Sequence, residues 1–151
     1  MKTIESIQDL APLVGQDVIV SDWFTVTQEH INQFAQATDD HQWIHVDIER
    51  AKAGPFKAPI AHGFLTLSLL PQFLASALTI RNTGMGVNYG LNRVRFTAPV
   101  PAGSRLRAHF KLLALDSIDK GGVQMTWDML VEREGSDKPV CVAESLTRRY
   151  P

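Results

Sequence analysis

Cysteine is almost absent from this chain of 151 residues, which contains Cys141 alone. A single cysteine excludes a disulfide within the chain and leaves no cysteine cluster that could bind zinc. Valine and alanine flank Cys141, and no histidine lies near it in the sequence. We therefore expect its thiol to be buried in a strand rather than to act as a nucleophile.

An excess of charge of either sign is also missing, since 15 Lys and Arg stand against 16 Asp and Glu, for a formal net charge of −1. The basic residues are mostly scattered among acidic ones. Such a surface produces no strong field to attract a polyanion. We therefore expect no nucleic-acid partner.

Long apolar runs are lacking as well. The most apolar stretch, residues 64–78, is too short to cross a bilayer and is interrupted by Ser68, Pro71 and Gln72. The first residues include Glu5 and no apolar segment typical of a secretory signal. These absences predict a cytoplasmic protein with no membrane partner. Because no low-complexity tract or repeat divides the chain, residues 1–151 are predicted to form one domain.

The patterns that are present predict helices first and strands later. Residues 4–13 are predicted to form a short helix and residues 17–25 a strand. A helix is expected from Thr27, a suitable N-cap, and a second short helix from Asp47 over residues 48–53. A longer helix, apolar almost all round and therefore buried, is predicted to begin near His62 and Gly63 and to run to residue 78.

Four long strands follow this helix in the prediction, separated by three segments rich in turn-forming residues. They cover residues 85–96, 104–115, 123–132 and 139–150. One strand, then helices, then four strands in succession indicate an α+β fold in which an antiparallel sheet wraps around one long buried central helix. Because such a sheet exposes its edges, we also expect a homodimer.

The stretch from Thr38 to His45 is where the chain concentrates polar groups suited to catalysis. Asp40 and His45 are five positions apart, which on an α-helix would place their side chains roughly 140° out of line. They converge only if the helix has ended, and the short polar side chains before them compete with a helical backbone. We therefore predict a loop over residues 40–46. Taken alone, Asp40 also fits a turn carboxylate, and His45 fits a histidine bonded to backbone at the edge of the core.

Three segments together resemble a known family. They are the Asp40–His45 loop, the Pro59-Ile60-Ala61-His62-Gly63 helix start, and the stretch of residues 88–96 with Pro99-Val100-Pro101-Ala102-Gly103-Ser104 after it. The chain resembles MaoC-like dehydratases and (R)-specific enoyl-CoA hydratases, which have the hot-dog fold, and it is most similar to the branch named after the nodulation protein NodN. The resemblance extends over nearly the whole chain.

The resemblance implies that Asp40 and His45 are the catalytic pair, because the family loop reads Asp-x-Asn-Pro-Leu/Ile-His. This sequence departs from that pattern with Gln42 and Trp43 in place of Asn-Pro. We expect Trp43 to border the acyl pocket and to influence which chain lengths are accepted. Many relatives also carry a serine nine residues after the histidine of the helix start, where this chain has Pro71, and Ser68 is then the nearest hydroxyl.

The implied reaction adds water reversibly to a trans-2-enoyl-CoA and gives an (R)-3-hydroxyacyl-CoA. In this interpretation Asp40 is the base that orients and deprotonates water, and His45 helps to hold the water and relays the proton. The backbone N–H of Gly63 donates to the thioester oxygen at a helix start. The acyl-CoA thioester is then the only small-molecule partner, with no cofactor and no metal. A site made by His41, His45 and Asp40 has none of the usual zinc spacings.

Two arginines are predicted to contact substrate, and two rival functions stay open. Arg93 and Arg95 share one face of a strand, where they either bind the phosphates of coenzyme A or belong to a solvated sheet face.

His41 is expected to be solvated and His62 to be structural or capping. The first rival function is a hot-dog acyl-CoA thioesterase, and the second is a non-catalytic acyl-CoA-binding or assembly subunit.

Overall fold

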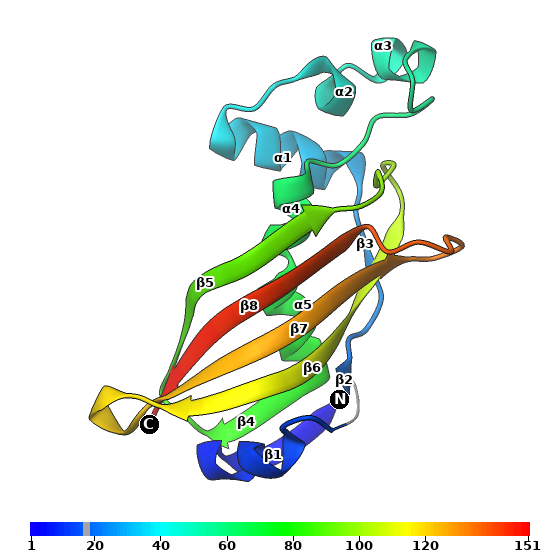
Figure 1. Ribbon diagram of the computed structural model, residues 1–151. Helices are drawn as coiled ribbons and strands as arrows, with labels where there is room; N and C mark the ends of the chain where they lie inside the picture. The colour runs from blue at the N-terminus through cyan, green and yellow to red at the C-terminus, as the bar shows by residue number, and fades with distance from the viewer. Residues whose placement is uncertain (17–18) are drawn as a thin grey trace.

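Four long antiparallel strands form most of a six-stranded sheet on which the other elements are arranged (Figure 1). The computed structural model describes residues 1–16 and 19–151. The strand order in the sheet is β2-β6-β7-β8-β5, and β3 also pairs with β6. The strands are β2 (Ile19–Val20), β3 (Phe24–Thr25), β5 (Met85–Phe96), β6 (Arg105–Ser117), β7 (Val123–Arg133) and β8 (Cys141–Tyr150).

Alternation along the central strands explains which face of the sheet is buried. In β6 the buried residues are Leu106, Ala108, Phe110 and Leu112, every second position. The same period occurs in β7, where Met125, Trp127, Met129 and Val131 are buried. A period of two places these side chains on one face of each strand. The four long strands match the predicted ranges to within two residues, and Cys141 is buried as expected.

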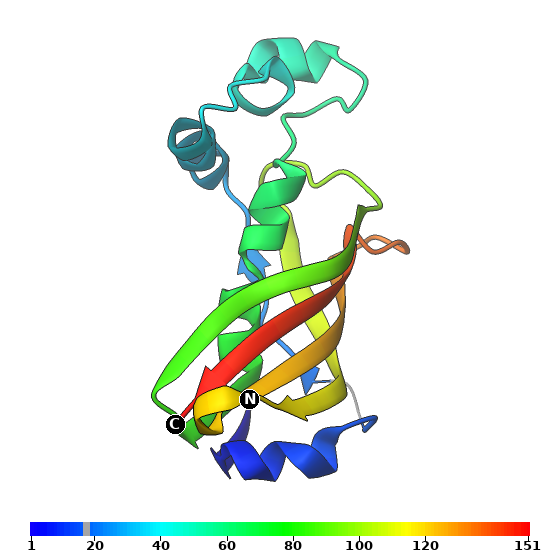
Figure 2. The same ribbon diagram turned by 60° about the vertical axis from the view of Figure 1, so that its left-hand side comes forward.

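The helix that covers this face runs along the sheet in two pieces, α4 (Gly63–Ser68) and α5 (Leu70–Ala77) (Figure 2). Its buried side chains include Leu65, Phe73 and Ala77. The predicted helix from residue 62 to 78 is confirmed with two corrections. It is divided at Leu69, and Phe64 is 67% exposed, so the helix is not buried all round.

The N-terminal segment differs most from prediction. Instead of a helix over residues 4–13, the chain forms β1 (Lys2–Ser6) and then the 3₁₀ helix η1 (Ile7–Leu13). β1 pairs in parallel with β4 (Leu78–Asn82), a strand that was not predicted and whose first residue was expected to end the long helix. Pairing of β1 with β4 thus takes the place of the helix expected at the start of the chain. Of the strand predicted over 17–25, only β2 and β3 form, and Asp17 and Val18 lie outside the described residues.

Three short helices lie beyond one end of the sheet, next to α4: α1 (Gln28–Thr38), α2 (Trp43–Val46) and α3 (Ile48–Ala53) (Figure 1). Both predicted caps are confirmed, because Thr27 Oγ1 accepts from the His30 N–H and Asp47 Oδ1 accepts from the Arg50 N–H. The predicted loop over 40–46 is shorter than expected, since its second half is α2. Among the described residues, no helix is long and apolar enough to cross a membrane.

Candidate functional site

The loop with Asp40 begins where α1 is stopped by its own C-cap. Asp39 adopts the left-handed conformation, with φ of 61°, which ends the helix and turns the chain. Asp40 Oδ1 then accepts a hydrogen bond of 3.4 Å from the Gln42 N–H, a short polar turn of the kind that aspartate favours. The Asp40 side chain remains 54% exposed, so its carboxylate keeps access to solvent.

His45 is held rigidly by its backbone and by its ring. Its N–H donates to the Gln42 carbonyl at 2.9 Å, and its carbonyl accepts from Gln28 Nε2 at 2.8 Å. Its Nδ1 lies 2.6 Å from the Ile60 carbonyl oxygen. A carbonyl can only accept, so Nδ1 carries the proton and, in the neutral ring, Nε2 keeps a lone pair. The ring is therefore presented as an acceptor in a fixed orientation, and His45 is 6% exposed.

His62, at the start of α4, connects the helix to the loop. Its Nε2 donates to the backbone carbonyl of Asp40 at 3.0 Å and lies 4.0 Å from Asp40 Oδ2. The His62 ring stacks on His45, with centroids 3.8 Å apart and an interplanar angle of 25°. The His62 ring also lies near Phe34, with the ring centroids 4.9 Å apart and tilted by 52°. These contacts agree with the expected structural role of His62.

The structure brings the predicted pair together. One carboxylate oxygen of Asp40 and one ring nitrogen each of His45 and His62 all lie within 4.8 Å of one another. One water molecule can bridge polar atoms at such separations. The end of α1 at Asp39 and the anchoring of His45 to Ile60 together allow the convergence that a continuous helix would forbid.

Burial determines the charge of His45. Desolvation lowers the pKa of His45 below its ordinary value, and neighbouring His62 lowers it further. The hydrogen bond to the Ile60 carbonyl and the charge of Asp40 act in the opposite direction but do not outweigh burial. The imidazole is consequently neutral at neutral pH, so its Nε2 can accept a hydrogen bond.

A pocket of about 350 Å³ opens beside His45. Gly63 and Thr66 of α4 line it together with Phe96 and Val100 from the opposite side. The Gly63 N–H is at the first position of α4, where helical N–H groups lack partners within the helix. Gly63 also allows Phe96 to approach closely, because a Cβ at this position would lie 2.6 Å from Phe96 Cδ2.

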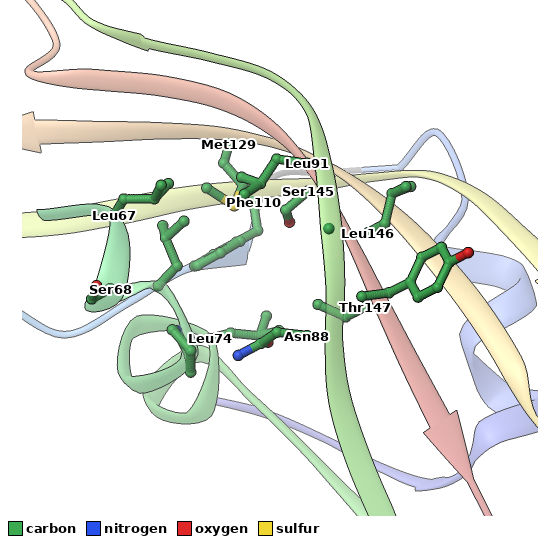
Figure 3. A pocket seen from close by; sticks show the side chains of 14 residues that line it. Leu67, Ser68, Leu74, Asn88, Leu91, Phe110, Met129, Ser145, Leu146 and Thr147 are labelled. Atoms are coloured by element: carbon green, nitrogen blue, oxygen red, sulfur yellow. The ribbon is translucent and has the colours of Figure 1, made fainter. Parts of the chain in front are cut away.

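A second cavity of about 400 Å³ lies between the helix and strands β5 and β8 (Figure 3). Its walls are largely apolar, with Leu67, Leu74, Phe110 and Met129 among the side chains in view. Ser68 lines this cavity rather than the pocket beside His45, and its hydroxyl donates to the Phe64 carbonyl at 2.7 Å. Ser68 is therefore not placed next to Asp40 and His45.

The expected position of Trp43 at the border of an acyl pocket stays a prediction, which the packing of this side chain does not favour. Trp43 lines neither of these two cavities. Its ring packs beneath the Arg50 guanidinium, 4.4 Å from the centroid, and a Cβ at Gly54 would lie 2.9 Å from Trp43 Cζ3. The indole therefore packs against α3 and its C-cap. Trp43 is a packing residue of the helical region within one chain.

The other predicted residues lie apart from the pair. Arg93 and Arg95 are exposed on β5 and line neither cavity, so a contact with coenzyme A stays a prediction for them. His41 is half exposed, as expected, with Nε2 3.4 Å from Asp39 Oδ1. Sequence reasoning missed Thr66, which is 2% exposed in the pocket beside His45. The sequence feature that could have indicated Thr66 is its spacing of three residues from Gly63, which places both residues on one face of the helix.

Asp40, His45 and His62 are also residue types that bind metal ions. Metal binding through His62 Nε2 would require a lone pair on that nitrogen, yet the Asp40 carbonyl fixes its proton there. The remaining pair offers too few ligands for a typical protein-held zinc ion. The expectation of a metal-free site therefore stays a prediction, supported by this hydrogen bond.

Comparisons with known proteins agree with this geometry. Residues 9–133 match the MaoC like domain. The chain is 55% identical over 148 residues to 3-hydroxyacyl-thioester dehydratase Z of Mycobacterium tuberculosis, covering 98% of each chain. It is 44% identical over 144 residues to nodulation protein N of Rhizobium leguminosarum bv. viciae, covering 94% of this chain and 89% of that protein.

The fold matches solved structures as well. R-hydratase PhaJ1 of Pseudomonas aeruginosa superposes with a TM-score of 0.68 at 25% identity, covering 89% of this chain and 79% of that one. The sheet wrapped around α4 and α5 is thus the predicted hot-dog fold. From its matching domain and its relatives, the chain belongs to the MaoC-like dehydratase family, in the branch that includes nodulation protein N.

Proposed function

We propose that this protein catalyses the reversible hydration of a trans-2-enoyl-CoA to the (R)-3-hydroxyacyl-CoA. The observation that carries the proposal is the convergence of Asp40 and His45 within 4.8 Å, with His45 lining a pocket that also contains the Gly63 helix start. The relative of 55% identity named as a 3-hydroxyacyl-thioester dehydratase supports the reaction class, and the superposed R-hydratase supports the stereochemistry.

In the proposed mechanism Asp40 and His45 hold one water molecule between them. Asp40 accepts a proton from that water as its oxygen forms a bond to C3 of the substrate. The neutral His45 accepts the second hydrogen bond of the water through its free Nε2 and keeps its own proton on Nδ1. The proton taken up by Asp40 then passes to C2 of the substrate, which returns Asp40 to its charged form. The sum is one water added across the double bond, and dehydration is the same sequence reversed.

Charge that develops on the thioester oxygen requires a donor, which we assign to the Gly63 N–H. This group lies at the start of α4 and lines the pocket beside His45. Among the described residues, no carbonyl accepts a hydrogen bond from it. A donor already oriented toward developing charge needs no reorganisation during the reaction, which makes such contacts effective in catalysis. None of these steps uses a cofactor or metal.

The apolar cavity of about 400 Å³ between the helix and strands β5 and β8 could hold the alkyl chain of the substrate. Thr66 lines the catalytic pocket, and the following residue, Leu67, lines the larger cavity (Figure 3). Burying methylene groups against Leu74, Phe110 and Met129 is favourable by about 0.8 kcal/mol each. We assign this cavity to the acyl chain.

We further propose that the active protein is a homodimer joined along β5. Among the strands that the structure describes, β5 lies at the edge of the sheet and pairs with β8 alone. Met85, Val87, Tyr89 and Leu91 on it are all exposed. A long edge with exposed apolar side chains is suited to pairing with a second copy. Light scattering should give a dimer for wild type and a lighter species for Val87→Lys, whereas Leu130→Lys on β7 should remain dimeric.

The decisive experiment for the activity is a crotonyl-CoA hydration assay of wild type beside Asp40→Asn and His45→Gln. Loss of the enoyl absorbance, without release of free thiol, is expected for wild type. Each variant should stay folded and lose about 10²–10⁴-fold in kcat/KM, the usual contribution of a positioned acid or base. Release of thiol would instead indicate a thioesterase, and binding without turnover would indicate a non-catalytic subunit.

A further inference from the structure

Thr66 carries a buried hydroxyl that the mechanism above does not use. The residue is 2% exposed, and among the described residues its Oγ1 has no hydrogen-bond partner. Buried polar groups in folded proteins nearly always have partners, so a hydroxyl without one marks a position where a water or a ligand group completes the bonding. Thr66 lines the pocket beside His45, and this pocket is where such a group would enter.

Two other hydroxyls in helices of this chain show that Thr66 is exceptional. Ser68, two residues further along α4, donates to the Phe64 carbonyl at 2.7 Å. Thr38 in α1 donates to the Phe34 carbonyl at 2.8 Å. Each of these hydroxyls thus donates its hydrogen bond to the carbonyl four residues earlier, as serine and threonine in helices often do. The Thr66 hydroxyl makes no such bond to His62, and its hydrogen remains available to the pocket.

The position of Thr66 on α4 determines what its hydroxyl can reach. Thr66 follows Gly63 by three residues, so the two share one face of the helix. The Cα–Cβ bonds of a helix tilt toward its N-terminus, which directs the Thr66 side chain over the turn that begins with Gly63. Both residues line the same pocket, and His45 lines it as well.

We propose that Thr66 is a substrate-binding residue whose hydroxyl donates a hydrogen bond to the thioester oxygen beside the Gly63 N–H. This inference rests on the proposed hydratase function and adds a second donor to it. Asp40 and His45 already provide the groups that hold water, whereas the enolate-like oxygen formed during the reaction has room for more than one donor. A neutral hydroxyl can donate there without introducing a charge that burial would penalise.

The contact can be measured separately from turnover. In an Asp40→Asn background the bound dienoyl thioester 2,4-hexadienoyl-CoA should persist, and its absorbance moves to longer wavelength when the carbonyl oxygen accepts hydrogen bonds. We expect a red shift in that background, a clearly smaller shift when Thr66→Val is added, and recovery with Thr66→Ser. Thr79→Val on β4, which removes a hydroxyl far from the pocket, should leave the shift intact.

Activity provides the second measurement. Thr66→Val alone should lower kcat/KM for crotonyl-CoA by about 10²–10³-fold, the range found for removal of one donor to an oxyanion, while Thr66→Ser retains most of the activity. Circular dichroism checks folding, and Thr66→Ala replaces Thr66→Val if the valine variant does not fold. An unchanged spectral shift in the folded valine or alanine variant would overturn the contact, even if activity falls.

The two proposals fail in different ways. If wild type does not hydrate crotonyl-CoA yet the spectral shift depends on the Thr66 hydroxyl, the hydratase assignment is wrong and the Thr66 contact stands. If hydration occurs and depends on Asp40 while the shift is the same with and without the hydroxyl, the Thr66 contact is wrong and the hydratase stands.

Discussion

The rings of His45 and His62 stack face to face, with centroids 3.8 Å apart, and only one of the two lines the pocket. His62 does not line the pocket but holds both other residues, because its Nε2 donates to the Asp40 carbonyl and its ring stacks on the His45 ring. One buried side chain therefore fixes the separation between the two proposed catalytic residues. His62 is a positioning residue, since it acts on the substrate only through Asp40 and His45.

Replacing His62 with phenylalanine tests this role. His62→Phe keeps a ring of similar size between His45 and Phe34 but loses the hydrogen bond to the Asp40 carbonyl. Misplacement of a catalytic group by about 1 Å can cost about 10²-fold in rate, so we expect kcat to fall by about 10- to 10²-fold with KM little changed. Steady-state kinetics with crotonyl-CoA measure kcat and KM separately. A raised KM at normal kcat would place His62 in substrate binding instead.

The protonation of His45 provides a second prediction. Burial lowers the pKa of His45 in the folded protein below the ordinary 6.5 of the unfolded chain. Between these two values the unfolded chain binds more protons, so the free energy of unfolding decreases as pH falls below 6.5 and is unaffected by this group above it. Hydration that requires neutral His45 should likewise persist to pH values somewhat below 6.5.

NMR titration of the histidine ring protons measures this pKa directly. In His62→Phe the pKa of His45 should rise, because the charge of His62 is one of the causes that lower it. A pKa of His45 above 6.5 in wild type would contradict the argument from burial and would predict loss of activity at a higher pH.

The parts of the fold that were predictable from sequence follow from local patterns. The long strands show alternation and turn residues, and Thr27 and Asp47 cap their helices as the residue types indicate. β1 and β4 were not predictable in this way, because they are five residues each and are stabilised by pairing with one another across more than seventy residues of chain. Local pattern contains no information about such a distant partner.

The sequence predicted some residues of the candidate site and not others. The motif identified Asp40, His45 and Gly63, and the structure brings the first two together and places Gly63 in the adjoining pocket. Ser68 was named as the hydroxyl nearest to Pro71, and Trp43 as the residue that replaces proline in the family loop. In the structure the Ser68 hydroxyl bonds to the Phe64 carbonyl and the Trp43 ring packs on Arg50, because a helical turn rotates successive side chains around the axis. Thr66 was missed since a threonine among leucines in a helix resembles ordinary core, and its free hydroxyl is visible only in three dimensions.

Gly63 has two reasons to be glycine, and a pair of substitutions separates them. Gly63→Ala would bring a Cβ within 2.6 Å of the Phe96 ring, so we expect a loss of about 1–3 kcal/mol in the free energy of unfolding, typical of overpacking. Adding Phe96→Leu should relieve the contact and restore much of that stability. Urea unfolding of the single and double variants, with Phe96→Leu alone as the control, measures both effects.

Hydration activity of the same double variant then tests the proposed role of Gly63. The added methyl group still faces the pocket in which the thioester oxygen would approach the N–H, so we expect activity to stay low after stability returns. Recovery of activity together with stability would mean that glycine serves the packing of Phe96 and that the carbonyl does not require its close approach.

Trp43 packs on Arg50 and Gly54, and this position argues against the expectation that it sets chain length. Trp43→Ala removes a partly buried ring from the junction of α2 and α3, so we expect the free energy of unfolding to fall by about 1–3 kcal/mol. The relative kcat/KM values for enoyl-CoA substrates of different chain length should stay the same, because the ring lines neither cavity. Trp23→Ala, which removes the other tryptophan packed beneath an arginine, is the matched control. A shift in chain-length preference for Trp43→Ala alone, at unchanged stability, would show that the indole reaches the acyl chain in the assembled protein.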